Sequence, residues 1–170
     1  MTIFETPRLR LRTVLEADFP HIFRMQSDAA TMRYIRPPTT DEQVVRERIT
    51  AWETYREKCP GLGVFILENK SDNAFVGYVT ARHVDFNPTN TEFEVGYTFA
   101  PEWWGQGVAS EIVPPLSQYL FEKSGTPRIV AFTDPENAAS IRVLLKSGFR
   151  EVGMRQIYEG MSKEFWLERS

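Results

Sequence analysis

Residues 92–120 place a strand pattern, a turn with two glycines and a helical pattern in direct succession. The segment begins as "EFEVGYTFA" and continues as "PEWWGQGVAS". The apolar face of the helix that follows is formed by Ile112, Leu116, Tyr119 and Leu120. Gly105 and Gly107 stand at the turn, and glycine allows a tight turn or a close approach of the backbone to a ligand. The segment therefore predicts that the first turn of a helix is presented at the end of a strand.

The first amides of a helix lack intrahelical partners and lie at the positive end of its dipole. They bind phosphate where no bulky side chain blocks them. A Walker loop is excluded because Val108 stands where the lysine is required, and Ser110 or Glu111 replaces the third glycine of a dinucleotide fingerprint. From these residues alone, two interpretations stay open: a phosphate-binding loop and a structural turn that enters a helix.

The rest of the chain mixes strand and helix patterns. Strands are predicted over residues 8–14, 64–69, 74–84, 92–100, 128–133, 150–158 and 163–168. Helices are predicted over residues 15–28, after a cap at Thr40 or Asp41, after the glycine turn, and over 134–147, with Asp134 as N-cap and Pro135 at the first helical position. With no repeat or linker, this order predicts a mixed α/β (α+β) sheet with helices on its faces, in one domain over residues 1–170.

Pro114 and Pro115 fall inside the helix that follows the glycine turn. Proline removes backbone hydrogen bonds within a helix, so we expect a kink or a break there. The first turn, which would contact phosphate, lies before both prolines.

Charge and cysteine content narrow the class of protein. The net charge is -3 and the isoelectric point about 5.5, which argues against nucleic-acid binding by bulk electrostatics. The single cysteine, Cys59, allows no internal disulfide, and His21 and His83 form no metal-ligand pattern. There is no signal-peptide pattern and no apolar run long enough to span a membrane. We expect a cytoplasmic protein without a metal.

The stretch "EVGYTFAPEWWGQGVASE", followed by "TDPENAASIRVLLKSGF", resembles the GNAT superfamily of acyl-CoA-dependent N-acetyltransferases. The N-terminal "ETPRLRLRTVLEADFPHIFRMQSD" is similar to its RimJ/RimL-like branch. The resemblance implies the GNAT fold, a central mixed, mostly antiparallel sheet that is splayed at its middle, with helices on both faces. It also implies acetyl transfer from acetyl-CoA to a primary amine by direct attack in a ternary complex.

The resemblance also implies where CoA binds. The pyrophosphate loop of the superfamily reads Q/R-x-x-G-x-G/A, and "WGQGVA" places Gly107 and Ala109 at its two small positions, with Trp104 at the first. The pantetheine arm is expected to pair with exposed backbone of the preceding strand, where an amide can face the thioester oxygen. The expected cofactor-binding residues are Thr98, Phe99, Ala100, Trp104, Gly105, Gln106, Gly107, Val108, Ala109, Ser110, Asn137 and Ser140.

The attacking amine must be neutral, and an α-amino group with a pKa of about 8 supplies more neutral form than a lysine with a pKa of about 10.4. Two carboxylates are candidates for the base: Glu94, on the strand before the loop, and Glu159, in the turn after residues 150–158. Many GNAT proteins use a tyrosine as the acid, but Leu144 stands at the matching position. Ser140 is the expected contact of the sulfur and the candidate proton donor.

The acceptor stays open: the resemblance fits either a protein N-terminus or a small-molecule amine. Arg33 and Arg36, in "RYIRPP", are candidates to contact an acidic group on it. Because a tyrosine is missing at Leu144, a non-catalytic CoA-binding sensor or interaction module stays the alternative. The sequence fits a monomer or a homodimer.

Overall fold

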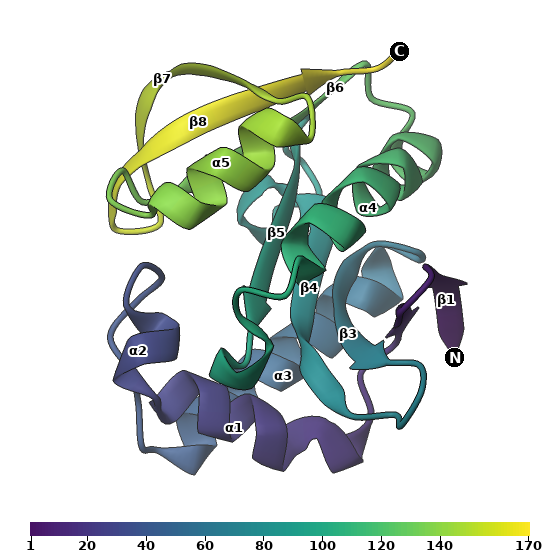
Figure 1. Cartoon of the computed structure of the whole chain (residues 1–170), viewed down its shortest axis with the longest axis vertical. Coiled ribbons are helices and arrows are strands. Elements are labelled where there is room, and N and C mark those ends of the chain that lie inside the picture. Colours follow the sequence, from purple (N-terminus) through teal and green to yellow (C-terminus); the bar gives the residue numbers. More distant parts are fainter.

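The computed structural model describes residues 1–170 as one eight-stranded sheet with helices packed on both faces (Figure 1). The strands are β1 (Thr2–Glu5), β2 (Leu9–Arg12), β3 (Gly63–Asn69), β4 (Phe75–His83), β5 (Phe93–Phe99), β6 (Arg128–Thr133), β7 (Arg150–Ile157) and β8 (Gly160–Glu168). The α-helices are α1 (Phe19–Ser27), α2 (Ala29–Met32), α3 (Glu42–Lys58), α4 (Val108–Ser124) and α5 (Ala138–Lys146). Short 3-10 helices lie at Glu16–Asp18, Val84–Phe86 and Pro101–Trp103.

The strand order is β1-β2-β3-β4-β5-β6-β8-β7, and all neighbours are antiparallel except β5 and β6. These two central strands run parallel and are paired at one position, Glu94 with Val130. Beyond that pair they diverge, so the sheet is splayed at its middle. The predicted fold class is confirmed.

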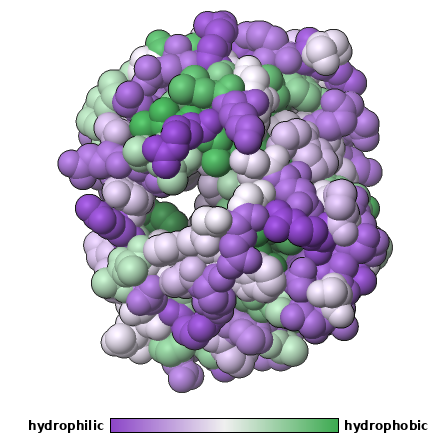
Figure 2. Space-filling view, in the orientation of Figure 1, coloured by the Kyte–Doolittle hydropathy of each residue, from purple (hydrophilic) through white to green (hydrophobic).

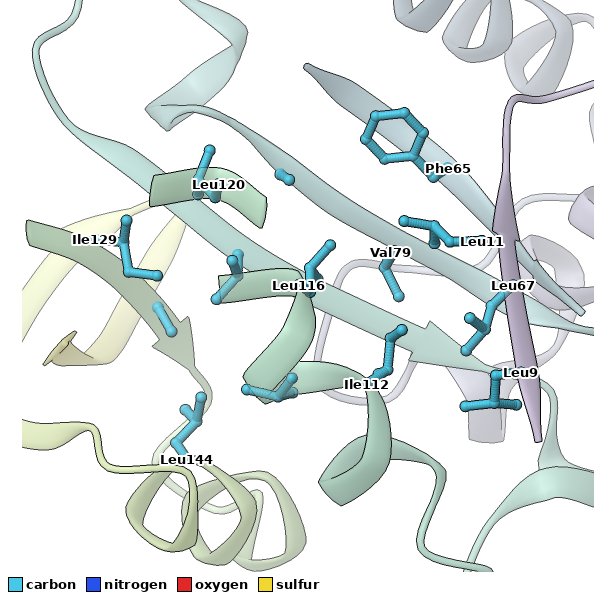
Figure 3. Close-up of a cluster of buried hydrophobic side chains, with 14 of the residues drawn as sticks. Leu9, Leu11, Phe65, Leu67, Val79, Ile112, Leu116, Leu120, Ile129 and Leu144 are labelled. Atoms are coloured by element: carbon cyan, nitrogen blue, oxygen red, sulfur yellow. The ribbon is translucent and has the colours of Figure 1, made fainter. Parts of the chain in front are cut away.

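Helices α4 and α5 cover one face of the sheet, and their apolar side chains meet those of the strands (Figure 3). Ile112, Leu116 and Leu120 of α4 are fully buried there. The opposite face is covered by α1 and α3, whose Ile22 and Val45 belong to a second buried cluster. Successive side chains of a strand point to opposite faces of the sheet, so β5 presents alternate side chains to the two faces.

The helix caps confirm one prediction and correct another. Asp41 is the N-cap of α3, and its side chain accepts a hydrogen bond from the amide of Gln43 at 2.9 Å. The predicted cap of α5 was wrong, because this helix begins at Ala138 with Asn137 as N-cap. The carboxylate of Asp134 instead accepts from the amide of Glu136 at 2.8 Å and closes a turn before the helix.

Two short elements, β1 and α2, were not predicted, and α4 is not broken at Pro114 and Pro115. Pro114 lies on the exposed side of α4, where a carbonyl that it leaves without a partner can reach water. The hydroxyl of Ser117 donates to the carbonyl of Val113 at 2.7 Å and supplies a further bond beside the prolines.

Candidate active site

The two parts of the sheet enclose a cavity of about 780 Å³ where β5 and β6 diverge. Figure 2 shows the surface hollowed between these two parts of the molecule. The cavity is lined by β5, the glycine turn and first turn of α4, the end of β6, the first part of α5, and α2 with the residues after it. It therefore joins the loop predicted to bind phosphate to the segment predicted to meet an acceptor.

The glycine turn leads directly into α4 with an open first turn. Gly105 has φ of 70° and Gly107 has φ of 76°, a left-handed conformation that favours glycine. Gly107 is the N-cap of α4 and no side chain caps the helix. The amides of Val108, Ala109 and Ser110 donate to no acceptor in the protein. A helix start with free amides and no blocking side chain fits a phosphate group.

The side chains around these amides hold the turn rather than cover it. Trp104 is half-exposed, and its indole donates to the carbonyl of Phe99 at 2.8 Å. Gln106 donates from its side chain to the carbonyl of Glu102 at 2.6 Å. Both bonds tie the turn to the strand end and the 3-10 helix before it.

The backbone of β5 presents its odd-numbered residues to the gap. The carbonyl of Glu92 accepts from the amide of Val84, and the amide of Ala100 donates to the carbonyl of Val76. Because bonding alternates along an antiparallel ladder, the even-numbered residues of β5 bond to β4. The main-chain groups of Tyr97 and Phe99 therefore point toward β6, which is not paired with β5 there.

This geometry corrects part of the predicted pantetheine contact. The backbone of Thr98 and Ala100 is used by β4, whereas the amide of Phe99 faces the gap and its carbonyl accepts from Trp104. Thr98 still lines the cavity, but Ala100 is fully buried and does not.

Asn137 and Ser140 lie together at the start of α5 and both line the cavity. The side-chain carbonyl of Asn137 accepts from the amide of Ser140 at 3.2 Å, so Asn137 caps the helix. The hydroxyl of Ser140 lies 2.8 Å from that of Tyr97. Leu144, where a tyrosine was sought, is buried at the cavity wall.

Tyr97 is the functional candidate that sequence reasoning missed. It points from β5 into the cavity, and its ring stacks on that of Phe99 with 5.4 Å between centroids. Burial raises the pKa of Tyr97, and the hydrogen bond with Ser140 opposes this rise. The phenol therefore keeps its proton at neutral pH. The only signal in the sequence was alternation, since Val95, Tyr97 and Phe99 share one face of the strand.

Glu94 is buried beside the cavity in an ion pair with Arg82, whose guanidinium nitrogen lies 2.7 Å from the carboxylate. The hydroxyl of Tyr158 donates a further hydrogen bond to Glu94. Burial raises the pKa of Glu94, and the charge of Arg82 opposes this rise. Glu94 does not line the cavity itself, although Gly96 and Thr98, on the same face of β5, do.

Glu159 lies in the turn between β7 and β8, is exposed, and has φ of 67°. Its side chain does not line the cavity. The neighbouring Tyr158 anchors this turn, because its hydroxyl donates to Glu94 and accepts from the amide of Asp85 at 2.8 Å. Of the carboxylates in the protein, only that of Asp134 lines the cavity.

No group of three or more His, Cys, Asp or Glu side chains is placed to hold a metal ion. None of the helices combines the length and the apolar character that crossing a membrane requires.

Comparison with known proteins defines the class. The family model "Acetyltransferase (GNAT) domain" matches residues 8–150. The chain belongs to the GNAT acetyltransferase family and is an acyltransferase. The "uncharacterized N-acetyltransferase YoaA" of Bacillus subtilis (strain 168) is 31% identical to it over 159 residues, which are 92% of this chain and 87% of that relative.

Solved structures give the same fold. An "acetyltransferase (GNAT family)" from Bacillus anthracis aligns with a TM-score of 0.76 at 26% identity, covering 98% of this chain and 96% of that one. A RimL ribosomal L7/L12 α-N-protein acetyltransferase in complex with coenzyme A aligns with a TM-score of 0.81 at 17% identity, covering 99% of this chain and 98% of that one. At this identity the neighbour shows the shared fold.

Proposed function

We propose that this acyltransferase moves an acetyl group from acetyl-CoA to a primary amine by direct attack in a ternary complex. One observation carries the proposal: a single cavity joins the free amides of α4, the unpaired backbone of β5 and the Ser140–Tyr97 hydroxyl pair. The acceptor amine is either the α-amine of a protein N-terminus or that of a small molecule.

The first turn of α4 would hold the pyrophosphate of CoA. The amides of Val108, Ala109 and Ser110 have no competing partner, and Gly105 and Gly107 give them their open approach. The amides of Tyr97 and Phe99, which point into the gap, would pair with the pantetheine arm as a neighbouring strand does. Two neighbours of the same fold were solved in complex with CoA, which supports CoA as the ligand.

The thioester supplies an acyl group on a thiol leaving group. Rigid backbone amides that face its oxygen stabilise the negative charge that develops as the amine attacks. When the carbon–sulfur bond breaks, we assign Ser140 as the donor of a proton to the sulfur. Tyr97 then donates its phenol proton to Ser140. The phenol recovers its proton from solvent after the product leaves. In this proposal Tyr97 supplies the hydroxyl that Leu144 lacks, which favours catalysis over a non-catalytic CoA-binding module.

For the proton that the amine loses, Glu94 is the better supported of the two predicted bases. It stands where β5 and β6 begin to diverge, paired in register with Val130, and burial raises its pKa while the charge of Arg82 opposes the rise. A base with a pKa nearer the working pH transfers protons more effectively. Glu159 stays the second proposal, with its exposed carboxylate in the β7–β8 turn.

The test is made in two stages on the whole chain. Thermal unfolding is first followed against rising acetyl-CoA, where a ligand at 100 times its Kd stabilises the native state by about 2.7 kcal/mol. Release of CoA thiol is then measured with a panel of amines and N-terminal peptides. We expect a saturating shift and turnover with part of the panel. No shift at millimolar acetyl-CoA would contradict the assigned site, and a shift without turnover on any amine would contradict the reaction.

A further inference from the structure

The end of the cavity formed by α2 and the residues after it carries positive charge without matching negative charge. Arg33 lines the cavity there, with its guanidinium 5.0 Å from the ring centre of Tyr34. Arg36 follows one turn later and Arg48 approaches from α3, both just outside the cavity lining. None of the three forms an ion pair.

The three arginines act on a common region. Arg48 is half-buried, and burial together with the charge of Arg36 lowers its pKa. Its guanidinium donates to the side-chain oxygen of Gln26 at 2.7 Å, a neutral partner that leaves the charge uncompensated. The amide nitrogen of Gln26 donates to the hydroxyl of Tyr78 at 3.4 Å, and Tyr78 is the register partner of Thr98 at the cavity wall. Gln26 and Tyr78 thus lead from Arg48 to β4, the strand that pairs with β5.

A cationic wall of this kind selects among amines by charge. Two like charges at close range repel, and the repulsion grows where a low-dielectric wall reduces screening. A polyamine or a lysine-rich peptide would bring further positive charge to this end of the cavity. An acceptor with a carboxylate beside its amine would instead form the ion pairs that Arg33 and Arg36 lack.

The sites assigned to CoA do not need these arginines. We assign the pyrophosphate to the backbone of α4, and the basic residues Arg142 and Lys146 line the cavity from α5. Figure 1 places α2 across the gap from α5, on the other part of the molecule. The charge at α2 is therefore free to meet the second substrate.

We propose that the acceptor is an anionic amine, one that bears a carboxylate within a few bonds of the attacking nitrogen and meets Arg33 and Arg36. This inference rests on the proposed acetyl transfer and names its substrate class. A free amino acid and an acidic peptide N-terminus share this chemistry, and the experiment separates the two sources.

Acetylation is measured for two matched acceptor sets. The first is 4-aminobutyrate, 4-aminobutanamide and 1,4-diaminobutane, and the second is the peptide amides Ser-Asp-Ala, Ser-Asn-Ala and Ser-Lys-Ala. We expect kcat/KM for the anionic member to exceed that for the neutral member by about tenfold in at least one set, with the cationic member lowest. The set that shows the preference identifies the source. Raising the salt from about 20 to 500 mM should reduce it, since exposed charges are then screened.

The variant R33Q/R36Q is expected to lower the preference below about twofold, because kcat/KM for the anionic acceptor falls more than kcat/KM for the neutral one. Lys58→Gln, an exposed charge change at the far end of α3, is the matched control and should keep the preference. Equal or better use of the neutral or cationic acceptors by the natural chain would overturn the inference, as would a preference that survives in R33Q/R36Q.

Calorimetry on the CoA-loaded protein separates this inference from the proposed function. If no amine is acetylated, tighter binding of an anionic amine than of its neutral partner would support the charge preference and contradict only the reaction. Equal binding would overturn the charge preference itself.

Discussion

Tyr97 and Ser140 are 43 residues apart in the sequence, and their hydroxyl oxygens lie 2.8 Å apart in the cavity. Tyr97→Phe removes the phenol but keeps the ring that stacks on Phe99. We expect kcat to fall by about a factor of 10², the low end of the range for general acid catalysis, with KM for acetyl-CoA unchanged. Steady-state kinetics and the acetyl-CoA thermal shift check this together.

A combined variant tests whether the two hydroxyls act as one unit. Ser140→Ala should lower kcat by a similar factor, and the double variant Y97F/S140A should be no slower than the slower single variant. Additive losses would mean that the two groups act independently and would contradict the proposed proton transfer between them.

Glu94 gives a prediction about pH. A protonated carboxyl cannot accept a proton, so kcat/KM should fall as the pH decreases through its pKa. Because burial raises that pKa, the fall should begin above the ordinary value of about 4.3. Glu94→Gln should abolish this acidic limb and lower kcat/KM by about 10². The exposed Glu57→Gln is the control, and an acidic limb that persists in Glu94→Gln would exclude Glu94 as the base.

At the scale of the element, α4 offers a matched pair of glycines at its two ends. Gly107 is its N-cap with φ of 76°, and Gly125 is its C-cap with φ of 69°. A glutamate at either position would be held in a left-handed backbone conformation, which costs about 1–2 kcal/mol. Only Gly107→Glu also places a carboxylate at the free amides. We therefore expect both variants to lose similar stability, and only Gly107→Glu to lose the acetyl-CoA thermal shift.

The elements that the sequence predicted well have strong local signals. The Asp41 cap, the strand before the glycine turn and the turn itself follow from backbone chemistry that neighbouring residues determine. β1 and α2 have four residues each and lack a clear periodic pattern, whereas the equally short β2 alternates strictly between leucine and arginine. The start of α5 was misplaced because Asp134-Pro135 can open either a helix or a turn, and the Asn137 cap decides between them.

In the candidate site, too, features within one segment could be predicted from sequence and contacts between segments could not. The glycine turn and the Asn137–Ser140 pair could be found from sequence because each lies within one segment. The Tyr97–Ser140 contact and the ion pair of Glu94 with Arg82 join different segments. They depend on how β5, β4 and α5 pack, which no local pattern contains.

At the scale of the whole molecule, α4 packs against both parts of the sheet, with β4 and β5 on one side of the gap and β6 on the other. Leu116, at its centre, is fully buried among residues of the sheet (Figure 3). Leu116→Ala should lower the free energy of unfolding by about 2–5 kcal/mol, since it removes buried contacts and leaves a cavity. Urea denaturation measures the change. Leu145→Ala, on the exposed side of α5 at 51% exposure, should change it by less than about 0.5 kcal/mol.

The single pairing of β5 with β6 means that the sheet is continuous at only one point across its centre. The unit made of β6, β7, β8 and α5 is therefore joined to the rest by few backbone hydrogen bonds, and the apolar packing of β6 and α5 against α4 holds the two parts together. A ligand seated in the gap would supply the hydrogen bonds that a missing strand would have made. Such a ligand would complete the sheet. The connection between the two parts of the molecule would then strengthen when the ligand binds and weaken when it leaves, once in each catalytic cycle.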